Sequence, residues 1–137
     1  MILFVDTSAF VALEDKDDEN YPAAVEYRER VAEGKTPFRL LYTSNYILNE
    51  TLTLLRAHLG HSIAVSFGTT ARTSGILKAL WVTPEVDSHA WEVFKRYKDK
   101  EFGYTDCTSF CLMEKYAIRT AFTFDKHFNQ YGLQQVP

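Results

Sequence analysis

The sequence predicts an α/β fold, a three-layer α/β/α sandwich in which helices cover both faces of a central, mainly parallel sheet. Short apolar runs, such as residues 2–5 and 120–124, lack polar alternation, which is typical of strands buried on both faces of a parallel sheet. Longer amphipathic stretches lie between these runs, and strands that alternate with helices form parallel sheets. The chain contains no internal repeat, low-complexity tract or linker, so we expect one domain over residues 1–137.

Local signals predict the elements in chain order. The first strand leads into a helix at 8–13, and after a charge-dense loop Pro22 begins a second helix. Ser44 or Asn45 caps a later helix, which Gly60 ends. The remaining expectations are strands at 39–43, 79–82, 119–124 and 133–136, and helices at 45–59, 62–77, 87–97 and 104–117.

The amino-acid composition is that of an ordinary globular protein. We expect the protein to be cytoplasmic. No apolar run is as long as a membrane span, and Met1 leads into the first strand without the features of a signal peptide. A net charge of −3 is not the basic charge that identifies many nucleic-acid-binding proteins, although bound divalent cations would change its sign locally. Cys107 and Cys111 are expected to pack as apolar residues, without a disulfide or a zinc site.

Two aspartates stand at the ends of apolar runs. Asp6 follows the strand at 2–5, and Asp125 follows the run at 120–124. Ligands of open α/β sheets bind at the carboxyl ends of the strands, so the two carboxylates share a crevice if their strands are neighbours. The alternative is that each aspartate simply caps the helix or turn that follows it.

Two further acids lie on helix faces that should be buried. At 100° per residue, Asp106 shares a face with Phe110 and Met113, while Glu50 lies at the flank of the apolar face that includes Leu52. An alternative exists for each acid. A first-turn aspartate complements the helix dipole, and a glutamate at the edge of an amphipathic helix is ordinarily solvated.

The four acids together fit one metal site. Clustered carboxylates repel one another, so without a cation some of them must stay protonated. Hard oxygen ligands select Mg²⁺ or Mn²⁺, and such an ion activates water and stabilises the charge that develops during phosphodiester hydrolysis. No other catalytic motif is present: the chain lacks a P-loop, a Rossmann fingerprint and a G-x-S-x-G elbow, and we assign no catalytic role to His58, His61, His89 or His127.

Four segments, in this order, resemble the PIN-domain family and especially its VapC-type toxin ribonucleases. They are FVDTSAF around Asp6, TSNYILNETLTLL around Glu50, GYTDCTSF around Asp106 and TFDKHF around Asp125, and they span almost the whole chain. The resemblance implies a PIN-like fold and an endoribonuclease that depends on Mg²⁺ or Mn²⁺, with these four acids as metal-binding and catalytic residues. It also implies an RNA substrate, a toxin role in a type II toxin–antitoxin pair with a separately encoded antitoxin, and a homodimer.

The resemblance also implies supporting roles. Thr7 or Ser8 would hydrogen bond to Asp6, and Ser109, one turn after Asp106, would help to orient a ligand or water. Some relatives carry an additional acid on the helix of Asp106, where this chain has Thr108 and Ser109, so the number of metal ions stays open.

Other features bear on RNA and leave alternatives open. Arg56, Arg72, Lys78 and the segment 94–98, in which aromatic and cationic residues alternate, are candidate RNA contacts. Isolated basic residues on helices are, however, ordinarily solvated surface. Two other classes of function remain: a catalytically weak module that binds RNA or protein, and a housekeeping nuclease or phosphatase that acts on another phosphoester.

Overall fold

The computed structural model describes residues 1–137, and its five strands form one parallel sheet in the order β3-β2-β1-β4-β5. The strands are β1 (Ile2–Val5), β2 (Leu40–Ser44), β3 (Leu77–Leu80), β4 (Thr120–Phe122) and β5 (Gln134–Val136). The central strand β1 pairs with β2 on one side and with β4 on the other. The predicted parallel sheet is therefore confirmed.

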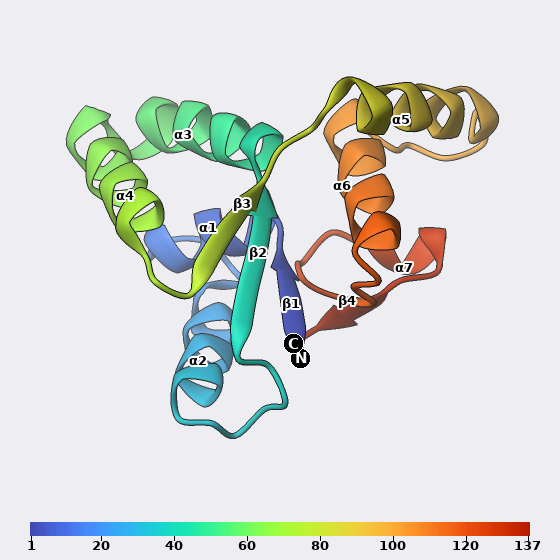
Figure 1. Ribbon diagram of the computed structural model, residues 1–137. Helices are drawn as coiled ribbons and strands as arrows, with labels where there is room; N and C mark the ends of the chain where they lie inside the picture. The colour runs from blue at the N-terminus through green and yellow to red at the C-terminus, as the bar shows by residue number, and fades with distance from the viewer.

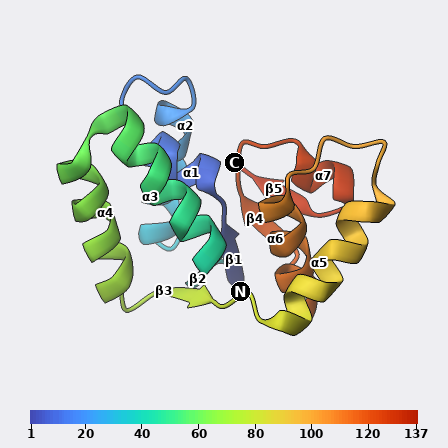
Figure 2. The same ribbon diagram turned by 90° about the horizontal axis from the view of Figure 1, so that it is seen from above.

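Seven helices cover this sheet. They are α1 (Thr7–Glu14), α2 (Tyr21–Ala32), α3 (Asn45–Leu59), α4 (His61–Thr73), α5 (Pro84–Arg96), α6 (Tyr104–Lys115) and α7 (His127–Tyr131). Figures 1 and 2 show α1 to α4 on one side of the sheet and α5 to α7 on the other, which is the predicted three-layer arrangement. None of these helices has the length and apolar character needed to span a membrane.

The order of the strands reverses between β1 and β4. The chain adds β2 and β3 on one side of β1, and then returns to add β4 and β5 on the other side. Connections on the two sides of such a reversal leave a crevice at the carboxyl ends of the two strands. Val5 pairs with Phe122, and the Asp6 amide donates to the Phe122 carbonyl at 3.1 Å, so the residues that follow both strands meet at this crevice.

Two predicted boundaries are wrong near β3. The helix expected over 62–77 ends at Thr73, and the strand expected at 79–82 begins at Leu77. The cause is the Ser74 hydroxyl, which accepts hydrogen bonds from the amides of Ile76 and Leu77 at 3.2 and 3.1 Å. This turn ends the helix and redirects the chain into the sheet.

The strand expected at 119–124 is also shorter than predicted, because β4 ends at Phe122. The amide of Thr123 still donates to the Val136 carbonyl at 3.1 Å, but the next two amides bond to side chains. Phe124 N donates to Ser8 Oγ at 2.9 Å, and Asp125 N donates to Thr123 Oγ1 at 3.0 Å. These bonds take the chain out of the sheet and into the crevice.

Helix α6 is more deeply buried than a single apolar stripe implies. Every residue from Cys107 to Met113 is buried, because α5 and α7 both contact α6. Both cysteines are buried, as expected for cysteines that pack as apolar residues. The helix ends at Lys115, two residues before the predicted end, and Ala117 takes a left-handed φ of 54°.

Candidate active site

Asp6 lies at the carboxyl end of β1, with only 6% of its surface exposed. Its Oδ2 accepts hydrogen bonds from Ser8 Oγ at 3.0 Å and from Thr123 Oγ1 at 2.8 Å. Asp6 stands at the N-cap position of α1, but its side chain makes no capping hydrogen bond, and the amide of Ala9 bonds to its backbone carbonyl instead. Capping therefore does not explain why a carboxylate is buried here.

Thr123 connects Asp6 to Asp125. Its hydroxyl donates to the Asp6 carboxylate and accepts the hydrogen bond from the Asp125 amide. The Ser8 hydroxyl acts in the same way, because it donates to Asp6 and accepts from the amide of Phe124. These four bonds fix the ends of β1 and β4 relative to each other.

The carboxylates of Asp106 and Asp125 both lie next to the imidazole ring of His127. The Nδ1 atom of His127 is 2.9 Å from Asp106 Oδ2 and 3.1 Å from Asp125 Oδ1. The Gly103 amide donates to Asp106 Oδ2 at 3.1 Å, and the His127 amide donates to Asp125 Oδ1 at 2.9 Å. The three side chains offer ligand atoms that all lie within 4.8 Å of one another, as a group that could hold a metal ion.

Glu50 lies on α3, across a cleft from the first turn of α6. The cleft has a volume of about 350 Å³, and its lining includes Glu50, Tyr46, Asn49 and Thr105. Thr105 directly precedes Asp106 in the chain, so Glu50 faces the segment that carries Asp106. No hydrogen bond or ion pair joins Glu50 to the other three acids.

No lysine or arginine forms an ion pair with Asp6, Asp106 or Asp125, and the basic side chain that contacts Asp106 and Asp125 is His127. Burial raises the pKa of Asp6 to about 6, and the negative charge of Asp106 adds to this rise, against hydrogen bonds from Thr123, Ser8 and the Thr7 backbone. Burial and the charge of Asp125 also raise the pKa of Asp106, although hydrogen bonds from His127 and Gly103 oppose this. A cation would relieve this repulsion, and oxygen-rich donors of this kind fit a divalent metal ion.

The other residues singled out from the sequence occupy different environments. The hydroxyls of Thr7 and Ser109 are buried and have no hydrogen-bond partner, so Thr7 does not support Asp6 through its side chain. Arg56 is exposed on the last turn of α3 and forms no ion pair. The sequence pointed to neither Thr123 nor Gly103, and His127 was assigned no role. The segment TFDKHF held two of these three residues, since its Thr and His flank Asp125 at two residues' distance.

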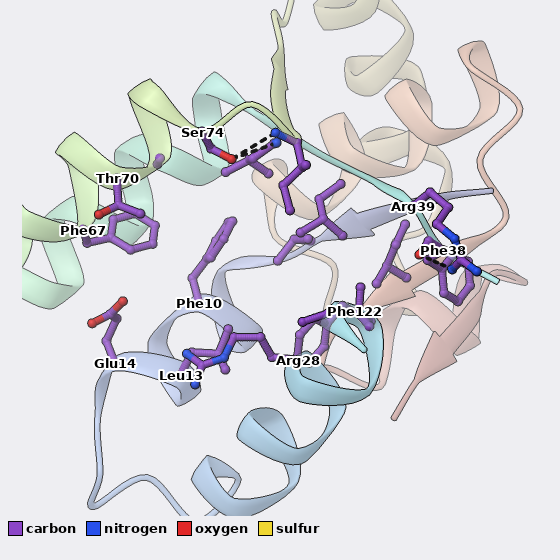
Figure 3. Close-up of a pocket in the computed structure, with 18 of the residues that line it drawn as sticks. Phe10, Leu13, Glu14, Arg28, Phe38, Arg39, Phe67, Thr70, Ser74 and Phe122 are labelled. Atoms are coloured by element: carbon purple, nitrogen blue, oxygen red, sulfur yellow. Dashed lines mark hydrogen bonds between the residues drawn. The ribbon is translucent and has the colours of Figure 1, made fainter. Parts of the chain in front are cut away.

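A second concave surface lies between the sheet and helices α1, α2 and α4. This apolar groove has a volume of about 510 Å³ and is lined mainly by hydrophobic residues. Figure 3 shows Phe10 and Leu13 of α1 and Phe67 of α4 lining it, with Glu14 and Arg28 also at its wall. Because the groove holds no cluster of acids or nucleophiles, it fits an apolar partner better than a chemical reaction.

Comparisons with known proteins agree with this architecture. The PIN-domain family model matches residues 3–133. The 23S rRNA-specific endonuclease VapC20 of Mycobacterium tuberculosis is 35% identical over 135 residues, which cover 98% of each chain. A VapC ribonuclease of Archaeoglobus fulgidus is 32% identical over 130 residues, which cover 94% of this chain and 80% of the relative.

Two solved structures share the fold. The crystal structure of M. tuberculosis VapC20, described as a sarcin–ricin loop cleaving toxin, superposes with a TM-score of 0.84 at 35% identity, over 97% of this chain and 96% of that one. FitAcB of Neisseria gonorrhoeae gives a TM-score of 0.69 at 14% identity, over 100% of this chain and 97% of that chain, a likeness of fold alone. The chain therefore belongs to the PIN-domain family and is homologous to the VapC ribonucleases.

Proposed function

We propose that this protein is a metal-dependent endoribonuclease and the toxin of a type II toxin–antitoxin pair. The observation that carries the proposal is the hydrogen-bonded cluster of Asp6, Asp106 and Asp125 at the switch point of the sheet, whose negative charge needs a cation. Homologues that are named as a 23S rRNA-specific endonuclease and a VapC ribonuclease support the same chemistry.

The side chains have distinct tasks in this proposal. Asp106 and Asp125, whose oxygens belong to one group of possible ligands, would bind the metal ion together with Asp6 and with Glu50, which lies across the cleft. When bound, the ion would activate water and stabilise the charge on the phosphate. Ser8 and Thr123 hold the Asp6 carboxylate in one orientation, and the Gly103 amide orients Asp106, so the ligands are preorganised.

We further infer that the substrate is a folded RNA loop. The mycobacterial relative is named for cleavage of the sarcin–ricin loop, and the shared chain length and fold support a similar class of substrate here. The exposed cations Arg56 and Arg72 remain candidates for contacts with phosphates outside the metal site.

We expect an antitoxin to bind in the apolar groove between the sheet and helices α1, α2 and α4. The groove lined by Phe10, Leu13 and Phe67 fits the apolar face of an amphipathic segment, and Arg28 and Arg39 at its wall would pair with acidic residues of that segment. Part of α1 lines the groove while Ser8, on the first turn of α1, contacts the candidate active site. A protein bound in the groove would therefore lie close to the acids.

The homodimer would form through exposed aromatic residues near α5. Trp81, Trp91 and Phe94 are 68%, 49% and 41% exposed, and the rings of Trp91 and Phe94 stack at 6.0 Å. Large exposed aromatic residues that lie together are typical of protein–protein interfaces.

Asp6→Asn is expected to lower cleavage of a sarcin–ricin loop RNA by at least about a hundredfold in Mg²⁺ or Mn²⁺, because it removes a charged group of the metal site. The exposed control Asp17→Asn should cleave at the wild-type rate. Gel assays of this RNA, a DNA hairpin and a phosphomonoester would test the reaction class. Wild-type protein that leaves the RNA intact but hydrolyses DNA or the phosphomonoester would contradict the proposal.

The same substitution should stabilise the metal-free protein at neutral pH. A pKa raised from 3.8 to about 6 means that protonated Asp6 stabilises the fold fully below pH 4, and that this stability is lost as the pH rises through 6. Urea denaturation in EDTA should therefore show Asp6→Asn more stable than wild type by up to about 3 kcal/mol at pH 7.5 and equally stable near pH 4. An equal difference at both pH values would show that the charge of Asp6 is not the cause.

Ile76→Lys is expected to weaken binding of the antitoxin by about tenfold or more, because it places a charge at the apolar groove. The product of the neighbouring reading frame is the candidate antitoxin to use in this test. Ile63→Lys on the same side of the molecule, outside the groove, is the matched control. Calorimetry and rescue of growth would measure the effect. Equal weakening by both substitutions would exclude the groove as the specific site.

Trp91→Lys is expected to convert a dimer into a monomer, because a charge replaces an exposed aromatic residue at the centre of the interface. Light scattering should give about twice 15.8 kDa for wild type and for the exposed control Tyr116→Lys. A wild-type monomer, or a dimer that tolerates Trp91→Lys, would rule out this interface.

A further inference from the structure

We propose that His127 is a nitrogen ligand of the metal ion, and that the site consequently selects a first-row transition metal ion, with Mn²⁺ as the probe, over Mg²⁺. The inference rests on the proposed function, because it concerns the same metal centre. It adds a ligand that the four predicted acids do not include.

The distances around His127 match a coordination shell. Its Nδ1 lies 2.9 Å from Asp106 Oδ2 and 3.1 Å from Asp125 Oδ1. Two ligands at about 2.1 Å from an octahedral ion, at right angles to each other, are about 3.0 Å apart. The imidazole nitrogen is therefore spaced from both carboxylates as an adjacent ligand of one ion would be.

The imidazole is also held in this position before any ion binds. His127 is the first residue of α7, and its backbone amide donates to Asp125 Oδ1 at 2.9 Å. Its ring packs edge-on against the buried Phe102, with ring centroids 5.5 Å apart, and only 17% of the side chain is exposed. A ring fixed by its backbone and by an aromatic neighbour loses little further freedom on binding an ion.

The Ser109 hydroxyl, on the same helix as Asp106, is buried and lacks a hydrogen-bond partner. Ser109 lies one turn after Asp106, on the same side of α6, and its Oγ is fully buried without a hydrogen bond. Buried polar atoms without partners are rare in folded proteins and call for a ligand or water. The helix that carries Asp106 thus also carries an unused polar atom one turn further on.

The identity of the ligand decides which ion is preferred. Mg²⁺ and Mn²⁺ both accept carboxylates and water, whereas imidazole suits transition metals, so one nitrogen ligand favours Mn²⁺. If His127 only donated a hydrogen bond to the two aspartates, it would affect both ions to the same degree.

Pulsed electron paramagnetic resonance of the Mn²⁺-loaded full chain tests this directly. Wild-type protein should show coupling between the Mn²⁺ electron spin and a nitrogen nucleus. His127→Gln should lose this coupling and bind Mn²⁺ about tenfold or more weakly in calorimetry, with Mg²⁺ affinity changed by less than about threefold. The control His61→Gln alters an exposed histidine on α4, away from the site, and should match wild type.

The outcomes separate the inference from the proposed function. Wild-type protein that binds Mn²⁺ and cleaves RNA without nitrogen coupling would refute only the role of His127. Coupling that persists in His127→Gln, or an equal loss of Mg²⁺ and Mn²⁺ affinity, would also refute it. Failure of wild type to bind either ion would instead overturn the metal-dependent function. The wild-type spectrum decides the matter even if His127→Gln does not fold.

Discussion

The repulsion and desolvation of carboxylates at one end of the sheet is the constraint on which the rest of the site depends. Asp6 is almost completely buried, and Asp106 lies close enough to raise its pKa further. Parallel strands make this crowding unavoidable, because β1 and β4 are neighbours and both deliver polar residues to the same edge. The surrounding donors, Ser8, Thr123 and the Gly103 amide, reduce the electrostatic cost without removing it.

The sequence was sufficient to predict the layers of the fold and the acids at the strand ends, because buried strands and the residues that end them leave local patterns. Side-chain contacts between residues that are far apart in the chain leave no such local pattern. Thr123 bonds to Asp6 across 117 positions, and His127 meets Asp106 only because α7 turns back toward α6. The early end of β4 has the same origin, since the amide of Phe124 bonds to Ser8 across 116 positions. The boundary error near β3 is local instead, because the Ser74 hydroxyl accepts from the amides of Ile76 and Leu77.

The fold separates two kinds of surface while connecting them through a short helix. The apolar groove reaches Val5 and Phe122, the last residues of β1 and β4, and so adjoins the acidic crevice. Helix α1 contributes Phe10 to the groove and Ser8 to the crevice. A macromolecule that contacts Phe10 would contact α1, the helix that also carries Ser8, a hydrogen-bond donor to Asp6. Recognition and chemistry are therefore neighbours in the structure even though they use different residue types.

The Thr123 and Ser8 hydroxyls each possess one proton, and both protons point at Asp6. Their lone pairs receive the amides of Asp125 and Phe124. Neither hydroxyl therefore has a proton left to donate to an arriving nucleotide. A hydrogen bond donated to a base by a side-chain hydroxyl would have to come from outside this pair, because the protons of Ser8 and Thr123 are already committed to holding Asp6 in place.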